Sequence, residues 1–183
     1  MILSEEELIN QLSQPQQRAK AFSVVVRTYQ ERLYWHIRKM VLSHDDANDV
    51  LQNTFMKAWN AIEGFRGDSQ MSTWLYRIAT NETLTFLSSK KTRNQFSIDE
   101  VETSFLQNLQ ADNYFNGNEI QLKLQEAIIT LPEKQRLVFN MKYFDDITYG
   151  QMEAILGTSV GALKASYHHA VKKIEKFFTE NDE

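Results

Sequence analysis

The sequence predicts an all-helical protein made of two small domains joined by a flexible linker. The chain has 183 residues but only 6 glycines and 2 prolines, too few for the many tight turns of a β-sheet protein. Apolar residues recur every three or four positions over long stretches, which is the period of an amphipathic helix, and almost no stretch alternates β-branched residues. The pattern is interrupted over residues 92–120, so the helices fall into two blocks.

The first block, residues 21–91, contains three predicted helices. The second of them is expected over residues 45–62, because the two aspartates at its start suit the first turn of a helix. Glycine and polar residues predict a loop over 64–69. Ser72 or Thr73 is expected to cap the third helix. The apolar stripe of the first helix consists of Phe22, Val26, Tyr29, Leu33, Ile37 and Met40.

The second block, residues 121–180, follows a linker rich in Asn, Gln, Asp, Glu and Ser. Within it, Thr148 and Gln151 form a predicted capping box, with a hydroxyl at the cap and an amide side chain three residues later. Gly157 is expected to end that short helix in the left-handed conformation. The block therefore contains a short helix, a tight turn and a longer helix capped by Ser159.

This arrangement predicts a helix-turn-helix motif, whose second helix enters the DNA major groove. At about 100° per residue, four apolar positions gather within roughly 60° of one another: Leu163, Tyr167, Ala170 and Ile174. The opposite face presents Gly161, Lys164, Ala165, His168 and Lys172, flanked by His169. Small residues there allow close backbone approach, and lysines meet phosphates or guanine edges. An amphipathic helix with a solvated basic face is the plainer interpretation.

A second motif combines aromatic and polar residues around the start of the third helix. Trp74, Arg77 and Asn81 lie on that helix, beside the predicted loop with Phe65 and Arg66. Aromatic rings that stack on bases, next to a cation for phosphate, suit single-stranded DNA. Trp74 also fits an ordinary core position. Arg77 and Asn81, however, are four residues apart on one face, and burying both would be costly.

The charge distribution favours nucleic-acid contact in both blocks despite a net charge of −4. Residues 21–91 carry nine basic and seven acidic side chains, and residues 159–178 carry four basic and one acidic. The acidic linker, with a net charge of −4 over residues 92–121, separates these two segments. Local patches matter more than the total charge for phosphate contact.

Several classes of protein are disfavoured by the composition. The chain has no cysteine, which excludes disulfides and thiolate chemistry and fits a reducing cytosol. Its first ten residues carry three glutamates, unlike a signal peptide, and no apolar run approaches the ~18 residues of a membrane span. His168 and His169 point about 100° apart on a helix, and no histidine has a carboxylate at metal-site spacing. We therefore expect a cytoplasmic protein that is not an enzyme and has no metal, cofactor or small-molecule substrate.

Together the motifs resemble those of extracytoplasmic-function (ECF) sigma factors, group four of the sigma-70 family, which have only regions two and four. The resemblance covers residues 20–178. In region two it rests on DANDVLQNTF at 46–55 with Trp59, on FRGDS at 65–69 and on TWLYRIA at 73–79. In region four it rests on LPEKQR at 131–136 and on the helix-turn-helix, where Gly161 and Lys164 match the recognition-helix pattern.

The resemblance implies a transcription initiation factor with four parts: an N-terminal extension (1–20), region two (21–91), a linker (92–120) and region four (121–180). Region two is expected to bind the clamp coiled coil of the largest subunit of core RNA polymerase through Asp49, Gln52, Asn53, Phe55 and Trp59. It is also expected to melt the minus-ten element of promoter DNA and capture a flipped base through Phe65, Arg66, Ser69, Trp74, Arg77 and Asn81.

Region four is expected to bind the flap of the second polymerase subunit and to contact the minus-thirty-five element through Arg136, Gln151, Ser159, Gly161, Lys164, Ala165, His168, His169 and Lys172. The acidic linker is expected to lie in the RNA channel of the polymerase. Relatives often carry arginines where this chain has Ser166, His169 and Val171. Its minus-thirty-five preference therefore cannot be taken from those relatives.

The resemblance also implies regulation by an anti-sigma factor, often a membrane-anchored one that would hold the chain at the inner membrane. The residues leave one other DNA-binding interpretation open, a dimeric helix-turn-helix regulator that uses the first block for dimerisation or ligand sensing. The exposed polar face expected at Asp49, Gln52 and Asn53 disfavours that interpretation.

Overall fold

The computed structural model describes residues 4–93 and 119–180, and within these ranges every regular element is helical. This confirms the predicted all-α fold. The chain forms two compact units, Met1–Lys90 and Lys91–Glu183. The predicted linker lies outside the described residues except at its two ends, so its flexibility stays a prediction.

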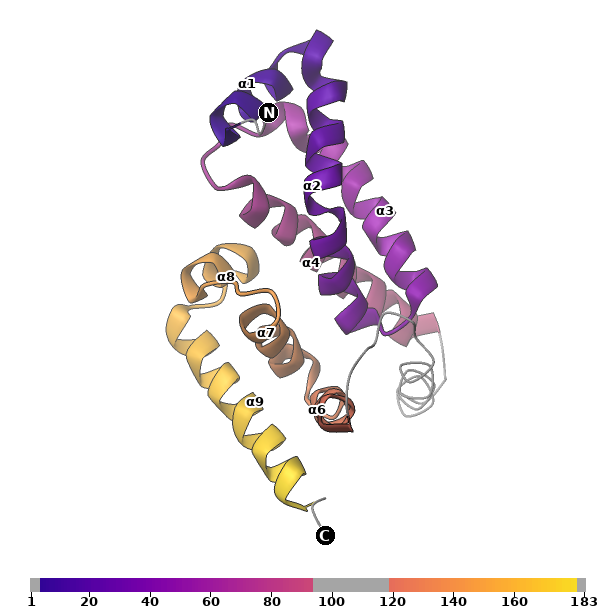
Figure 1. The fold of residues 1–183 in the computed structure, drawn as a ribbon, viewed down its shortest axis with the longest axis vertical. Helices are drawn as coiled ribbons and strands as arrows, with labels where there is room; N and C mark the ends of the chain where they lie inside the picture. Colours follow the sequence, from indigo (N-terminus) through magenta and orange to yellow (C-terminus); the bar gives the residue numbers. More distant parts are fainter. Residues whose placement is uncertain (1–3, 94–118, 181–183) are drawn as a thin grey trace. The chain divides into compact units, whose positions relative to one another are not determined.

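Unit 1 is a bundle of helices (Figure 1). Its elements are α1 (Glu5–Ser13), α2 (Pro15–Val41), α3 (His44–Ala61), the short 3₁₀ helix η1 (Ile62–Gly64) and α4 (Met71–Arg93). Helices α2 and α3 pack side by side, and α1 packs on α2. The core contains Leu33 and Ile37 of α2, Val50 of α3, and Leu75 and Ala79 of α4.

Polar side chains connect α4 to the two helices beside it. His36 of α2 is buried and its Nε2 lies 2.9 Å from the hydroxyl of Thr80 in α4. Lys57 of α3 forms an ion pair with Glu82. Buried polar groups are costly unless they are hydrogen-bonded, so the His36–Thr80 pair favours one register of α4 against α2.

Two details of unit 1 differ from the sequence predictions, and a third feature was not predicted. The predicted cap at Ser72 or Thr73 is wrong, because α4 already begins at Met71 and Thr73 is buried. Gly64 belongs to η1 rather than to the loop that follows. Residues 4–20 contribute α1 and the first turn of α2, and Leu12 of α1 is only 2% exposed. They are therefore packed into unit 1.

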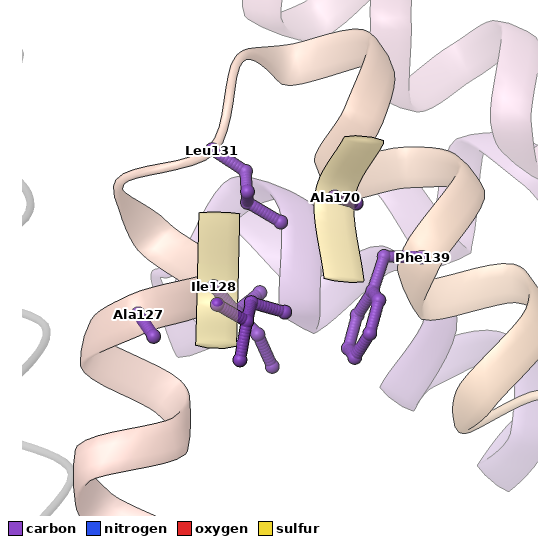
Figure 2. Packing of buried hydrophobic residues seen from close by; sticks show 6 residues of the cluster. Ala127, Ile128, Leu131, Phe139 and Ala170 are labelled. Carbon is purple, nitrogen blue, oxygen red and sulfur yellow. The ribbon is translucent and has the colours of Figure 1, made fainter. Parts of the chain in front are cut away.

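Unit 2 contains α6 (Glu119–Ile129), α7 (Glu133–Tyr143), α8 (Tyr149–Leu156) and α9 (Val160–Glu180). A buried apolar cluster joins α6, α7 and α9. Figure 2 shows three of its members, Ile128, Leu131 and Phe139, with their side chains directed toward one another. The ring of Phe139 also stacks on that of Tyr167, with centroids 5.6 Å apart. These contacts fix the rotation of α9 about its axis.

The predicted helix-turn-helix boundaries are confirmed. Thr148 and Gln151 form both hydrogen bonds of the capping box at the start of α8. Gly157 ends α8 with a φ of +65°, and the hydroxyl of Ser159 accepts from the amide of Ala162 at the start of α9. The turn between α8 and α9 is therefore defined by local hydrogen bonds and one left-handed glycine.

The Gly157→Ala variant should destabilise unit 2 by about 1–2 kcal/mol, the usual cost of the left-handed conformation for a residue with a Cβ. No atom lies within 4 Å of the position that a Cβ would take, so conformational strain is the only cost. The helical circular-dichroism transition should move to a lower denaturant concentration. The denaturant midpoint of the tryptophan fluorescence transition should not move, because Trp35, Trp59 and Trp74 all lie in unit 1.

Gly161→Ala is the matched control, because Gly161 lies inside α9 and also has open space around it. We expect this variant to be at least as stable as the unmodified chain. Equal destabilisation by the two substitutions would contradict the role given to the left-handed turn.

Candidate polymerase and nucleic-acid interfaces

The outward face of α3 is polar at one end and apolar at the other. Asp49, Gln52 and Asn53 are all exposed, as predicted. The inward face of the helix, with Ala47, Val50, Thr54 and Ala58, is buried, so helical periodicity directs these three side chains to solvent. The structure therefore places the polar part of the predicted polymerase contact on one accessible surface.

The two aromatic residues of this predicted contact also pack against another ring inside unit 1. Phe22 of α2 meets the rings of Phe55 and Trp59 edge-to-face, at centroid distances of 6.4 and 5.1 Å. Phe55 is half-buried, whereas Trp59 is 41% exposed. Trp59 therefore has an anchored ring with an accessible edge, which is a favourable arrangement for a binding hot spot.

Sequence reasoning missed Met56, which is 57% exposed on the same face of α3. It lies three residues after Asn53 and seven after Asp49, so all three share one side of the helix. An exposed flexible thioether next to an exposed tryptophan is typical of a protein-binding surface. The spacing in the sequence contained this signal. We name the set Asp49, Gln52, Asn53, Met56 and Trp59 the α3 face.

The predicted base-capture residues meet at the start of α4. The ring of Phe65, from the loop after η1, packs on that of Trp74 with centroids 4.9 Å apart. Both side chains are half-buried, and so is Ser69. Arg66 in the loop is exposed. An aromatic pair therefore lies next to an exposed cation, as single-stranded DNA binding requires.

Further along α4, Arg77 and Asn81 are both exposed, as the sequence predicts. They follow Trp74 at spacings of three and seven residues and therefore continue its face of the helix. The loop residues 65–69 and this face form one surface of unit 1. We name it the loop–α4 surface.

The predicted DNA face of α9 is exposed at all six positions: Gly161, Lys164, Ala165, His168, His169 and Lys172. Leu163, Ala170 and Ile174 on the opposite side are buried, which fixes this orientation. Ser159 at the start of α9 is also exposed. Ser166 and Val171 are half-buried at the edge of the face.

Two lysines lie over the ring of Tyr149, the first residue of α8. Lys164 Nζ is 5.9 Å from the ring centroid and Lys142 Nζ is 5.5 Å from it. Burial raises the pKa of Tyr149 above its usual value, and the neighbouring phenol of Tyr167 adds to the shift. The phenol is therefore neutral at pH 7, and its ring faces attract both ammonium groups. This holds two positive charges near the start of α8.

Two residues of the predicted minus-thirty-five set have other roles in the structure. Arg136 is only 8% exposed, and its Nη1 donates to the carbonyl of Ile129 at 3.4 Å. This arrangement places its guanidinium against the end of α6, where it offers little surface for a direct DNA contact. The Gln151 carboxamide oxygen accepts from the amide and hydroxyl of Thr148, so it caps α8.

The described residues contain no group of three or more metal-ligating side chains close enough to hold a metal ion. None of the described helices is both long and apolar enough to cross a membrane.

Comparison with known proteins identifies both units. Residues 25–93 match Sigma-70 region 2, and residues 121–174 match Sigma-70, region 4. The chain therefore belongs to the sigma-70 family, and its two units carry the two regions in the expected order.

Within that family, the chain is homologous to ECF sigma factors. It is 29% identical to the ECF RNA polymerase sigma-E factor of Escherichia coli (strain K12) over 94% of this chain and 93% of that protein. It is also 29% identical to the ECF RNA polymerase sigma factor SigW of Bacillus subtilis (strain 168), over 85% and 88%. The match to Sigma-70 region 2 explains the first block, so the dimerisation or ligand-sensing role that a dimeric regulator would give it is not needed.

Solved structures share the fold. CnrH, in complex with the cytosolic domain of CnrY, aligns with a TM-score of 0.72 over 97% of this chain and 99% of that one, at 20% identity. The sigma factor RpoE of Bartonella quintana, in complex with the anti-sigma factor NepR, aligns with a TM-score of 0.69 over 90% and 99%, also at 20% identity.

The Met56→Ala variant should weaken binding to core RNA polymerase by about 1–2 kcal/mol, roughly ten-fold, because it removes an exposed apolar contact from the α3 face. Fluorescence anisotropy of the labelled full-length chain measures the affinity. Gln30→Ala is the control, because Gln30 is exposed on α2 and lies outside the α3 face. An unchanged affinity for Met56→Ala would exclude this face as the contact.

Proposed function

We propose that the protein is an ECF-type transcription initiation factor that binds core RNA polymerase, directs it to two-part promoters and opens them. One observation supports this best: the chain carries sigma regions 2 and 4 in order, and each region exposes a surface of suitable chemistry. Region 2 offers a polymerase-binding face and a single-strand surface. Region 4 offers a helix for duplex DNA.

The α3 face is the proposed polymerase contact, on the clamp coiled coil of the largest subunit. Its carboxylate and two amides supply directional hydrogen bonds, and Met56 and Trp59 supply apolar area. The combination fits a partner helix pair that offers both basic and apolar side chains. The flap of the second subunit is the proposed partner of region 4.

The loop–α4 surface is the proposed site for the minus-ten element. Extruding a base from the duplex costs a few kcal/mol, so the protein must offer a prepared place for it. Phe65 and Trp74 supply aromatic surface, and Arg66 and Arg77 supply positive charge. Asn81 and Ser69 offer hydrogen-bonding groups for base edges.

The exposed face of α9 is the proposed reader of the minus-thirty-five element. Gly161 and Ala165 let the helix backbone approach the groove floor, and His168 and His169 offer ring nitrogens at base edges. Lys164 and Lys172 meet phosphates. Because α9 contains lysines but no arginine, we expect weak and strongly salt-dependent binding of region 4 by itself.

An anti-sigma factor is the proposed regulator, and membrane anchoring of that partner would hold the chain at the inner membrane. The two structural relatives described above were each solved with a bound partner, which supports this proposal. The acidic linker is proposed to lie in the RNA channel of the polymerase, where its net charge of −4 over residues 92–121 suits basic walls.

Run-off transcription with purified core polymerase and a promoter library tests the function. We expect initiation only when this protein is present, at templates that share one two-part element. Duplex DNA binding without any initiation by core polymerase from the same host would contradict the proposal. That result would favour a dimeric regulator.

Lys164→Ala should weaken binding of the full chain to minus-thirty-five duplex DNA and reduce the slope of log K against log salt by about 1, because one phosphate contact is lost. A salt titration of DNA affinity measures this slope. Lys173→Ala is the control, since Lys173 is exposed on α9 outside the proposed face. Equal slopes for the two variants would contradict the assignment of Lys164.

A further inference from the structure

Helix α1 has no role in the function proposed above, yet it is firmly fixed in unit 1. Ser4 and Glu7 form a complete capping box at its start. Leu12 is buried, and its carbonyl accepts from Nε of Arg18 at 2.9 Å. A helix held at both ends can act as a rigid support for whatever rests on it.

One side chain of α1 caps α4. The Oε1 atom of Glu5 accepts a hydrogen bond from the amide of Met71 at 2.5 Å, although the residues are 66 positions apart. Met71 is the first residue of α4, and its amide has no partner within the helix. A carboxylate there also interacts favourably with the positive end of the helix. Glu5 thus supplies the cap that Ser72 and Thr73 do not.

A second side chain of α1 lies directly under the loop before α4. A Cβ atom placed on Gly67 would lie 3.1 Å from Cδ1 of Ile9, so the loop backbone rests on this side chain. Gly67 has a φ of +79°, which makes this point of the loop conformationally distinctive. Arg18, just after α1, also lies 3.6 Å from Glu63 in η1, before the loop.

Three residues of α1 and early α2 therefore hold this part of the chain. Arg18 contacts η1 before the loop, Ile9 lies under its middle, and Glu5 caps α4 after it. Glu5 is also near α2, because its charge helps to raise the pKa of Tyr29, after the larger effect of burial. Its carboxylate thus lies close to both α2 and α4. A loop that must receive an extruded base gains from being held in this way before DNA arrives.

We propose that α1 is a brace for the base-capture loop, and that Glu5 and Ile9 are positioning residues for promoter opening. The inference rests on the proposed function of the loop–α4 surface. It assigns to the first residues of the chain a part in DNA melting, although neither side chain needs to touch DNA.

Amide hydrogen exchange on the free full-length chain tests the brace directly. Glu5→Ala should speed exchange over residues 65–74 by about ten-fold, since the opening free energy of a local segment sets its protection. Glu5→Gln keeps an acceptor oxygen and should have a smaller effect. Ile9→Ala should act mainly on residues 66–69. Glu6→Gln is the matched control, because Glu6 is also exposed in the first turn of α1.

Promoter opening by the same variants with core polymerase tests whether the brace contributes to DNA melting. Fluorescence of a 2-aminopurine placed in the minus-ten element should rise about ten-fold more slowly with Glu5→Ala, because the loop must first be ordered. Affinity for core polymerase and for minus-thirty-five duplex should stay unchanged. A purely structural role for Glu5 would lower all three together.

Unchanged exchange over residues 65–74 in Glu5→Ala and Ile9→Ala would overturn the brace. Faster exchange with normal promoter opening would overturn its role in melting. Failure of the unmodified chain to open any promoter would instead overturn the proposed function, while hydrogen exchange in the free chain would still decide whether α1 holds the loop.

Discussion

Burial of one apolar stripe on each long helix decides which residues that helix can present to a partner. In α9, Leu163 and Ile174 are buried against the core of unit 2, and Tyr167 stacks on Phe139. The helix cannot rotate without breaking these contacts, so Gly161 and the residues that share its face stay in solvent. The same constraint on α3 keeps its polar and apolar recognition residues on one outward surface.

Features set by local interactions could be predicted from the sequence. The capping box at Thr148, the left-handed Gly157 and the spacing of apolar residues in α9 depend only on near neighbours, and the structure confirms them. The start of α4 could not be predicted in this way, because Glu5 supplies the contact from 66 residues away. The burial of Arg136 could not be predicted for a similar reason, since it depends on the packing of α6 and α7.

The candidate sites show the same division. Exposure of Asp49 and Arg77 followed from helical periodicity, which the sequence contains in full. Met56 was missed because an isolated methionine in a helix is more often a core residue, although its spacing from Asp49 and Asn53 predicts the exposure that the structure shows. The stacking of Phe65 on Trp74 joins a loop to a helix, and composition alone does not determine such a contact.

The most direct test of this account is a cryo-electron microscopy structure of the full-length chain bound to core RNA polymerase and an open promoter. The account predicts that the α3 face is buried against the polymerase, that the loop between η1 and α4 holds an extruded base, and that Gly161 and Ala165 lie in the major groove. A bound chain whose α3 face remains in solvent, or whose α9 does not contact DNA, would contradict it.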